Sequence, residues 1–249
     1  MPKETKPIIK KIIFEAKYQP KLSFYNLLMT AAEELKGYPH WLTERLFVVL
    51  KNYDKRCSLA IKHNSFAFDQ DSDNLSNEKE KLSEALEKLP KSLKLSAYTR
   101  LGYRRKYILP VNMAYESLIS IMELKLFSQD KNLKMILPKE MTNSTYILNF
   151  VEESTHFNLT IGPISKPEIP NYIEFNKKHH LNPESADTDY LKVRESYPEV
   201  GVFFDLDIYQ QDDNLDIQHA LTFINEVRQK MNKIISNLCN YILSKKIEV

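Results

Sequence analysis

The feature that most constrains the fold is an apolar repeat near the C-terminal end of the chain. It follows the segment Gly201 to Tyr209, in which apolar residues alternate with polar ones as in a strand. After that strand, apolar residues recur at intervals of three and four, with no polar residue in the series: Ile217, Ala220, Ile224, Val227, Met231, Ile234, Leu238 and Tyr241. This spacing predicts a long amphipathic helix with one apolar seam.

Such a seam either packs lengthwise on a sheet of its own chain or pairs with another helix. In the second case the residues expected at the interface are Ile217, Ile224, Met231 and Leu238. A second helix, expected after Asn112, is apolar around most of its circumference, which also predicts burial or docking.

The first half of the chain reads as strands with helices between them. Residues 12–18 alternate as a half-buried strand, and helical spacing follows over residues 24–35. Two β-rich runs, 46–52 and 57–63, are separated by a short polar connection and predict a hairpin. A charged helix is expected over residues 78–89, with a narrow apolar stripe typical of a surface helix.

The second half repeats this order of hairpin, excursion, strand and helix. Its hairpin is expected over residues 145–161, and a proline-rich excursion follows before the strand at Gly201. We therefore predict an α+β fold with two lobes of antiparallel sheet, each covered by helices, and an internal duplication. The predicted lobes are residues 1–138 and residues 144–249, joined by the polar linker Pro138 to Ser144.

Composition limits the class of protein. The 249 residues are 43% hydrophobic, enough for a substantial core, and the net charge is only +2, so any basic character is local. Cys57 and Cys239 are too few for a disulfide framework, which favours a reducing compartment. No apolar run approaches the roughly 18 residues of a membrane span. These observations predict a cytoplasmic protein without membrane contact.

Residues 98–110, with the sequence YTRLGYRRKYILP, form the most distinctive stretch of the chain. As a strand, this stretch places Arg100, Gly102, Arg104 and Lys106 on one side. We call these four residues the basic stripe. The other side carries Leu101, Tyr103, Arg105, Tyr107 and Leu109.

Two interpretations of the basic stripe stay open. In the structural one, Arg100 or Arg104 pairs with Asp205 or Asp207 on a neighbouring strand, and Gly102 marks a bulge, a bend or a close approach of backbones. In the other, the stripe binds a ligand such as nucleic acid, with its cations on phosphates and a base stacked on an aromatic ring. The ligand-binding residues are then Tyr98, Arg100, Gly102, Arg104 and Lys106.

The sequence lacks the common motifs of catalytic and nucleotide-binding sites. Glycine occurs only at positions 37, 102, 162 and 201, so neither a dinucleotide-binding fingerprint nor a P-loop can be written. No nucleophile elbow occurs. Asp205 and Asp207 lie on one face of a strand and could together hold a hard cation. The candidates for a third metal ligand are Glu199 and the pair His179 and His180, and none of them is closely spaced with the two aspartates. We expect no catalytic residue, metal or cofactor.

The sequence resembles a family of uncharacterised bacterial proteins of this size with a sporadic distribution among genomes. The resemblance rests on Arg100, Gly102 and Arg104 in TRLGYRR, followed by Asn112 and a helix with Tyr115. The family's usual end, a strand with alternating acids and then a long helix, is similar to residues 201–243. Here Arg105 stands where an aromatic residue usually follows the second arginine.

A scattered distribution is typical of mobile or defence-associated genes. Together with the lack of catalytic motifs and the two apolar helices, it favours a noncatalytic interaction or regulatory protein. We expect a subunit of a bacterial defence or toxin-associated system, with a protein partner or a second copy of the chain. The alternative is a nucleic-acid-binding protein that uses the basic aromatic strand over residues 98–109.

Overall fold

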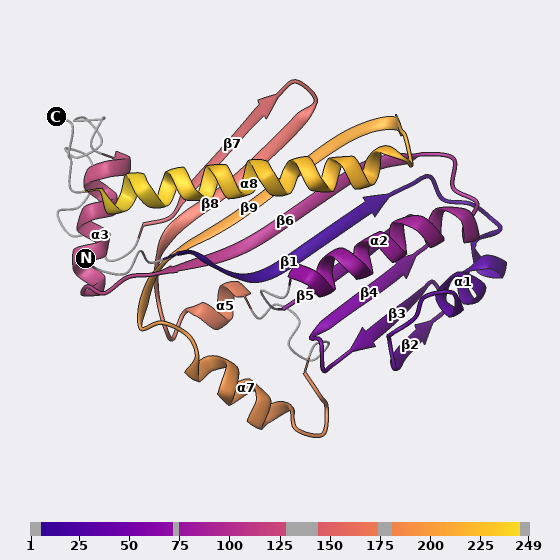
Figure 1. Cartoon of the computed structure of the whole chain (residues 1–249), viewed down its shortest axis with the longest axis horizontal. Helices are drawn as coiled ribbons and strands as arrows, with labels where there is room; N and C mark the ends of the chain where they lie inside the picture. Colours follow the sequence, from indigo (N-terminus) through magenta and orange to yellow (C-terminus); the bar gives the residue numbers. More distant parts are fainter. Residues whose placement is uncertain (1–5, 72–74, 128–143, 174–180, 245–249) are drawn as a thin grey trace.

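Strands from both halves of the chain join in a single antiparallel sheet of nine strands, with the order β2-β3-β4-β5-β1-β6-β9-β8-β7 (Figure 1). The fold is seen in a computed structural model, which describes residues 6–71, 75–127, 144–173 and 181–244. The strands are β1 Ile8–Lys17, β2 His40–Glu44, β3 Phe47–Asn52, β4 Cys57–Lys62, β5 Ser65–Gln70, β6 Tyr98–Pro110, β7 Tyr146–Glu152, β8 Thr155–Ser165 and β9 Val200–Leu215.

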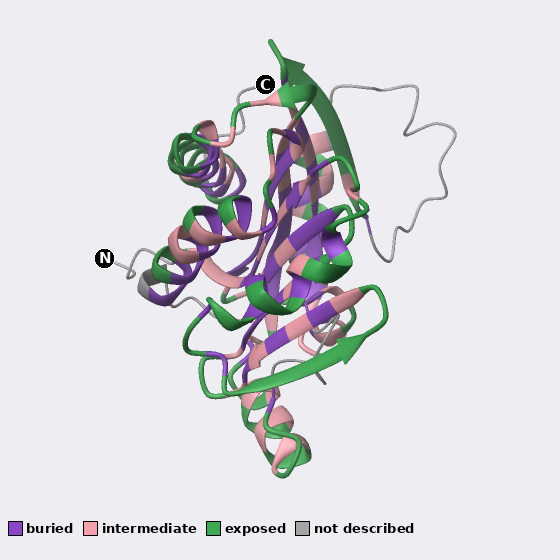
Figure 2. Ribbon diagram, turned by 90° about the vertical axis from the view of Figure 1, so that its right-hand side faces the viewer, coloured by how far each residue is buried: buried purple, intermediate pink, exposed green. Residues whose placement is uncertain are grey.

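Helices cover the central strands on one face of the sheet (Figure 1). In Figure 1 the long helix α8 and the helix α2 both cross the front of the sheet, and Figure 2 shows the two on the same side of the buried strands. The helices are α1 Phe24–Glu33, α2 Leu75–Ser92, α3 Tyr115–Met122, α5 Ile169–Ile173, α7 Ala186–Glu195 and α8 His219–Leu243, and a short π-helix Glu123–Phe127 continues α3.

The α+β class is confirmed, but the structure does not show two lobes. The strand that closes the first half, β6, pairs with β1 on one side and with β9 from the second half on the other. Because both edges of β6 are hydrogen-bonded, the two expected sheets merge into one. Residues 138–143 of the expected linker lie outside the described residues.

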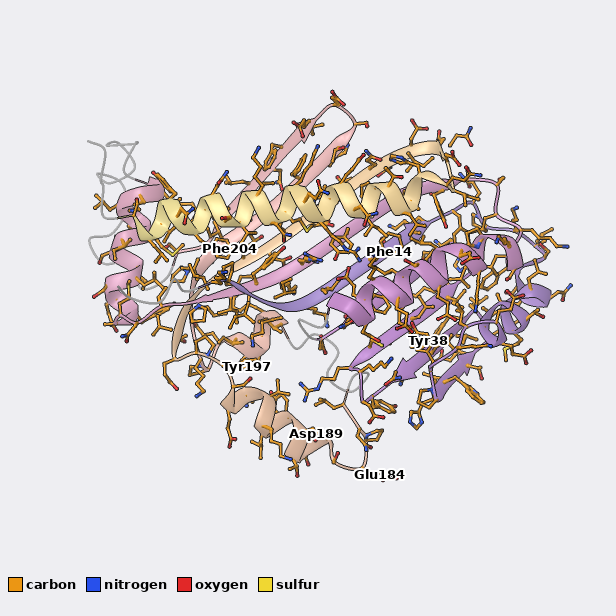
Figure 3. All side chains as sticks on the ribbon, viewed as in Figure 1. Phe14, Tyr38, Glu184, Asp189, Tyr197 and Phe204 are labelled. Atoms are coloured by element: carbon orange, nitrogen blue, oxygen red, sulfur yellow. The ribbon has the colours of Figure 1, made fainter. Side chains whose placement is uncertain are left out.

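The main core lies between the sheet and the helices α2 and α8. Phe14 on β1 and Phe204 on β9, both labelled in Figure 3, are fully buried there. The stripe on α2 also belongs to this core, since Leu82, Ala85 and Leu89 are buried. The expected surface helix therefore covers the sheet, and its exposed side carries charged residues such as Glu87 and Lys91.

A second, smaller core lies on the opposite face of the sheet, at the end where β6 and β9 approach α5. Ile108 and Phe203 from the sheet pack there with Ile169 and Ile173 of α5 and with Tyr197, which is labelled in Figure 3. Beyond this cluster, the same face carries mostly polar and charged side chains. The two faces of the sheet are therefore chemically different.

Two strands, β2 and β5, were not predicted from the sequence. The segment that forms β5 lies between the expected hairpin and the expected charged helix, where no element was predicted, and β2 lies just after the expected end of the first helix. Both strands extend the sheet on the side away from β6. The strand β2 consequently forms one edge of the sheet, and β7 forms the other.

Candidate functional site

The basic stripe lies on the face of the sheet opposite α2 and α8. Leu101, Tyr103 and Leu109, on the other side of β6, belong to the main core. Lys106 instead points toward α5, where its Nζ donates a hydrogen bond of 2.5 Å to the carbonyl oxygen of Tyr172. The predicted division of β6 into a polar side and a core side is therefore what the structure shows.

Arg104 is held by a carboxylate on the neighbouring strand. Its Nε donates to Asp205 Oδ1 at 2.6 Å, and its Nη2 donates to Asp205 Oδ2, so the guanidinium and the carboxylate meet through two parallel hydrogen bonds. Lys106 Nζ lies 3.7 Å from the same carboxylate. Asp205 is buried, and two cations of the stripe therefore compensate its charge.

Arg100 is held from both neighbouring strands. Its Nη1 donates to Glu15 Oε2 on β1 at 2.6 Å, and its Nη2 lies 3.5 Å from Asp207 Oδ2 on β9. The guanidinium also lies over the ring of Tyr209, 4.4 Å from the ring centroid. A Cβ atom at Gly102 would lie 3.4 Å from this guanidinium, an ordinary van der Waals contact, so the position of Arg100 does not require a glycine here.

Tyr98 does not belong to the stripe. It is fully buried, and its ring packs near Phe66 in the main core, with 6.1 Å between the ring centroids. Tyr98 pairs with Leu215 and Arg100 with Gln211, so the register shifts between them and the alternation of faces is broken. The expectation that Tyr98 stacks on a base beside the arginines is therefore wrong for this fold.

The electrostatics of the stripe are balanced. Arg100, Arg104 and Lys106 face the carboxylates of Glu15, Asp205 and Asp207, so three cations meet three anions. Burial lowers the pKa of Lys106, with Asp205 acting in the opposite direction. Burial raises the pKa of Asp207, although the two arginines oppose this rise. The stripe is an ion-paired network and presents little net positive charge.

On the core side of β6, Arg105 takes part in a buried polar network that the sequence did not reveal. Arg105 Nη2 lies 3.2 Å from Glu78 Oε2 on α2, and Arg105 Nε donates to Tyr103 Oη at 2.8 Å. Arg228 on α8 donates through Nε to Glu78 Oε1 at 3.0 Å. Tyr103 Oη also donates to Glu78. The network joins the sheet to both covering helices.

The apolar seam of α8 faces the sheet of its own chain. Ile224 and Met231 are buried in the main core, and Ile217 and Leu238 are partly buried against it. None of the four residues expected at an interface therefore forms an exposed apolar surface. The apolar seam is therefore buried against the sheet of its own chain, which is the first of the two alternatives for this helix.

Seven of the fifteen exposed large apolar residues in the described part of the chain lie on the two edge strands or in the turn after β2, and Figure 2 draws most of both edge strands in the exposed colour. On β7, Ile147 is 68% exposed, Val151 60% and Leu148 50%. On β2, Trp41 and Leu42 are exposed, next to exposed Leu46 in the turn that follows. These positions have no counterpart in the sequence prediction, because exposure at an edge depends on strand order.

The other candidate groups do not form a site. Cys57 and Cys239 are both buried and free, and burial raises the pKa of each thiol. Within the described ranges, no group of three His, Cys, Asp or Glu side chains is arranged to hold a metal ion. His179 and His180 lie outside those ranges. No helix in the described part of the chain is long and apolar enough to cross a membrane.

No protein-family model matches the sequence, and no curated protein matches it either.

Proposed function

We propose that this chain is a noncatalytic interaction protein that binds protein partners through the edges of its sheet. The observation that carries the proposal is the concentration of exposed apolar side chains on β7 and β2. An edge strand offers unpaired backbone groups, and exposed apolar side chains beside them add a hydrophobic contribution to pairing. A molecule that uses such an edge gains main-chain hydrogen bonds and apolar burial together.

The state of the basic stripe favours this proposal over nucleic-acid binding. Arg104 and Arg100 already donate hydrogen bonds to carboxylates, so most of the positive charge that would attract a phosphate is compensated. Tyr98 is buried and offers no stacking surface. The resemblance to a sporadically distributed bacterial family extends the proposal to a subunit or regulator in a defence or toxin-associated system, which a survey of neighbouring genes tests.

Photo-crosslinking in the native host tests the interaction itself. We substitute the photoreactive residue p-benzoylphenylalanine at Ile147 on β7, at Trp41 on β2 and, as a control, at Lys91, whose exposed side chain lies on α2. Protein adducts are expected from an edge position and not from Lys91. Failure of both edge positions to give adducts, or equal adducts from Lys91, would overturn the proposal.

A further inference from the structure

Among the strands in the described part of the chain, β7 exposes the most large apolar side chains. Four of its seven residues are exposed large apolar side chains, namely Ile147, Leu148, Phe150 and Val151. They lie on both faces of the strand, because successive residues of a strand alternate between faces. Phe150 stacks on Phe157 of β8 at 4.6 Å between ring centroids, which holds its ring on the α8 side.

β7 also lacks the features that usually prevent edge strands from pairing. Natural edges carry lysine, proline or bulges that discourage another chain from adding to the sheet. β7 contains no lysine, arginine or proline, and its one charged residue, Glu152, is tied to Lys230 on α8 at 2.8 Å. Its register with β8 is regular from Tyr146 to Glu152. The backbone is therefore presented as a straight, uninterrupted template.

The opposite edge is built differently. β2 is five residues long, follows Pro39 directly, and carries His40 and Glu44 at its ends. Charged or polar ends and a flanking proline are the devices that natural proteins use to blunt an edge. The contrast indicates that β7 is the edge suited to strand addition.

The sequence of β7 is complementary to itself in the antiparallel orientation. When two copies are aligned about Asn149, Leu148 of one copy lies opposite Phe150 of the other, and Ile147 lies opposite Val151. Each of the four exposed apolar residues in this register therefore meets an apolar residue on the same face, while Tyr146 lies opposite Glu152. The two Asn149 side chains meet at the centre, where amide groups can donate and accept hydrogen bonds mutually.

We propose that two copies of this chain pair β7 to β7 in antiparallel orientation about a two-fold axis through Asn149, which extends the sheet across the dimer. The inference rests on the proposed interaction function and names its partner. A two-fold axis places the same patch on both subunits, and a self-complementary strand satisfies that condition. The α8 faces of the two subunits then lie on the same side of the continuous sheet.

Sedimentation velocity with a matched pair of variants tests the dimer. The wild type is expected to shift from monomer to dimer between about 1 µM and about 100 µM, a range suited to a narrow interface. Ile147→Lys places a charge on the pairing edge and should stay monomeric throughout this range. Trp41→Lys, at an equally exposed apolar position on β2, should dimerise like the wild type. A wild type that stays monomeric at the highest concentration overturns the proposal.

A cysteine at the centre of the edge tests the register. Opposed residues of antiparallel strands have Cα atoms about 4.5 to 5.5 Å apart, within the range that a disulfide spans. Asn149→Cys should therefore form a disulfide-linked dimer under mild oxidation, while Thr43→Cys on β2 should not. Cys57 and Cys239 are buried and give little background. A dimer linked equally well through Thr43→Cys contradicts the inference.

The two proposals fail in distinguishable ways. If Ile147 photo-crosslinks to another protein while the purified chain stays monomeric, the second-copy inference is wrong and the interaction function stands. If the chain dimerises through β7 and no other protein is captured, the partner is the second copy. If neither edge captures anything and the chain is monomeric, both are wrong.

Discussion

The centre and the outer edge of the same sheet differ in how far their side chains are already paired or buried within the molecule. At the centre, β6 is hydrogen-bonded on both sides, and its arginines at 100, 104 and 105 all contact carboxylates. At the edge, β7 has a described neighbour only in β8 and exposes apolar side chains on both faces. The arginines of β6 are matched by carboxylates of the same chain, whereas the apolar side chains of β7 are left exposed by the described residues.

This difference separates two functions that the sequence left open. A conspicuous cluster of cations draws attention in a sequence, yet its value for binding depends on whether carboxylates already occupy it. An apolar run such as residues 146–151 looks like an ordinary strand until the strand order places it at an edge. Side chains and backbone groups that have no partner within the chain indicate a binding surface better than an unusual composition does.

The largest expected effect comes from breaking the centre at Glu78. Glu78→Gln leaves buried Arg105 and partly buried Arg228 without this counter-charge, and loss of one partner from a buried ion pair costs about 3 to 5 kcal/mol. The free energy of unfolding from urea denaturation, read by circular dichroism, measures this loss. Glu87→Gln on the same helix, at an exposed pair with Lys91, should change stability by less than about 0.5 kcal/mol. Equal stability of the two variants would show that the buried network contributes nothing.

A smaller effect is expected from the basic stripe. Arg104→Ala removes both hydrogen bonds from the buried carboxylate of Asp205 and leaves Lys106 as its remaining cation, so a loss of about 1 to 3 kcal/mol is expected. The folded variant should bind single-stranded DNA and RNA no differently from the wild type, with no binding by either in low salt. Fluorescence anisotropy of labelled oligonucleotides measures this. Salt-sensitive binding by the wild type that Arg104→Ala weakens without unfolding would contradict the structural role of the stripe.

The smallest effect concerns the pH dependence of stability through Asp207. Burial raises the pKa of Asp207 in the folded state, so the folded chain binds this proton more tightly than the unfolded chain. The resulting stabilisation is fully present below the unfolded value of 3.8 and is lost as the pH rises through the folded pKa. Asp207→Asn lacks it, so the wild type should gain stability relative to this variant as the pH falls from about 6 to about 4.

Urea midpoints measured across this pH range test the prediction. Asp213→Asn, at the exposed end of the same strand, provides the baseline for loss of an aspartate. A relative loss of wild-type stability on acidification would show that the arginines outweigh burial and lower the pKa of Asp207 instead.

Much of the fold was predictable from the periodicity of apolar residues. Strand β1, the β3 and β4 hairpin, and α8 appear where alternation or helical spacing placed them. Strand order was not predictable, because pairing of β6 with β9 joins residues about a hundred positions apart and leaves no local signal. The merging of the two expected sheets follows from that single pairing.

The seam of α8 was predicted in part. The spacing of three and four has a mean period of 3.5 residues, whereas a straight helix has 3.6 residues per turn and drifts away from such a seam. The buried face accordingly moves from Val227 and Met231 to Ile235, Cys239 and Ile242, while Tyr241 is about half exposed. The expected contacts hold for the first half of the helix and shift by one residue in the second.

The candidate site was predictable where it depended on alternation alone. One of the two open interpretations of the basic stripe paired Arg100 or Arg104 with Asp205 or Asp207, and in the structure Asp205 and Asp207 contact Arg104 and Arg100. The position of Tyr98 was not predictable, since an irregularity in pairing breaks the alternation. Glu78 was missed because a glutamate on a charged helix looks exposed until the helix is placed on the sheet.

Hydrogen exchange of backbone amides at two protein concentrations tests the central claim most directly. Residues of β6 should exchange slowly and those of β2 rapidly at both about 1 µM and about 100 µM, because their pairing does not depend on a second chain. The amides of β7 should exchange more slowly at the higher concentration, as its free edge becomes hydrogen-bonded to another copy. Exchange in β7 that is the same at both concentrations, with new protection appearing at the basic stripe or elsewhere, would contradict the account.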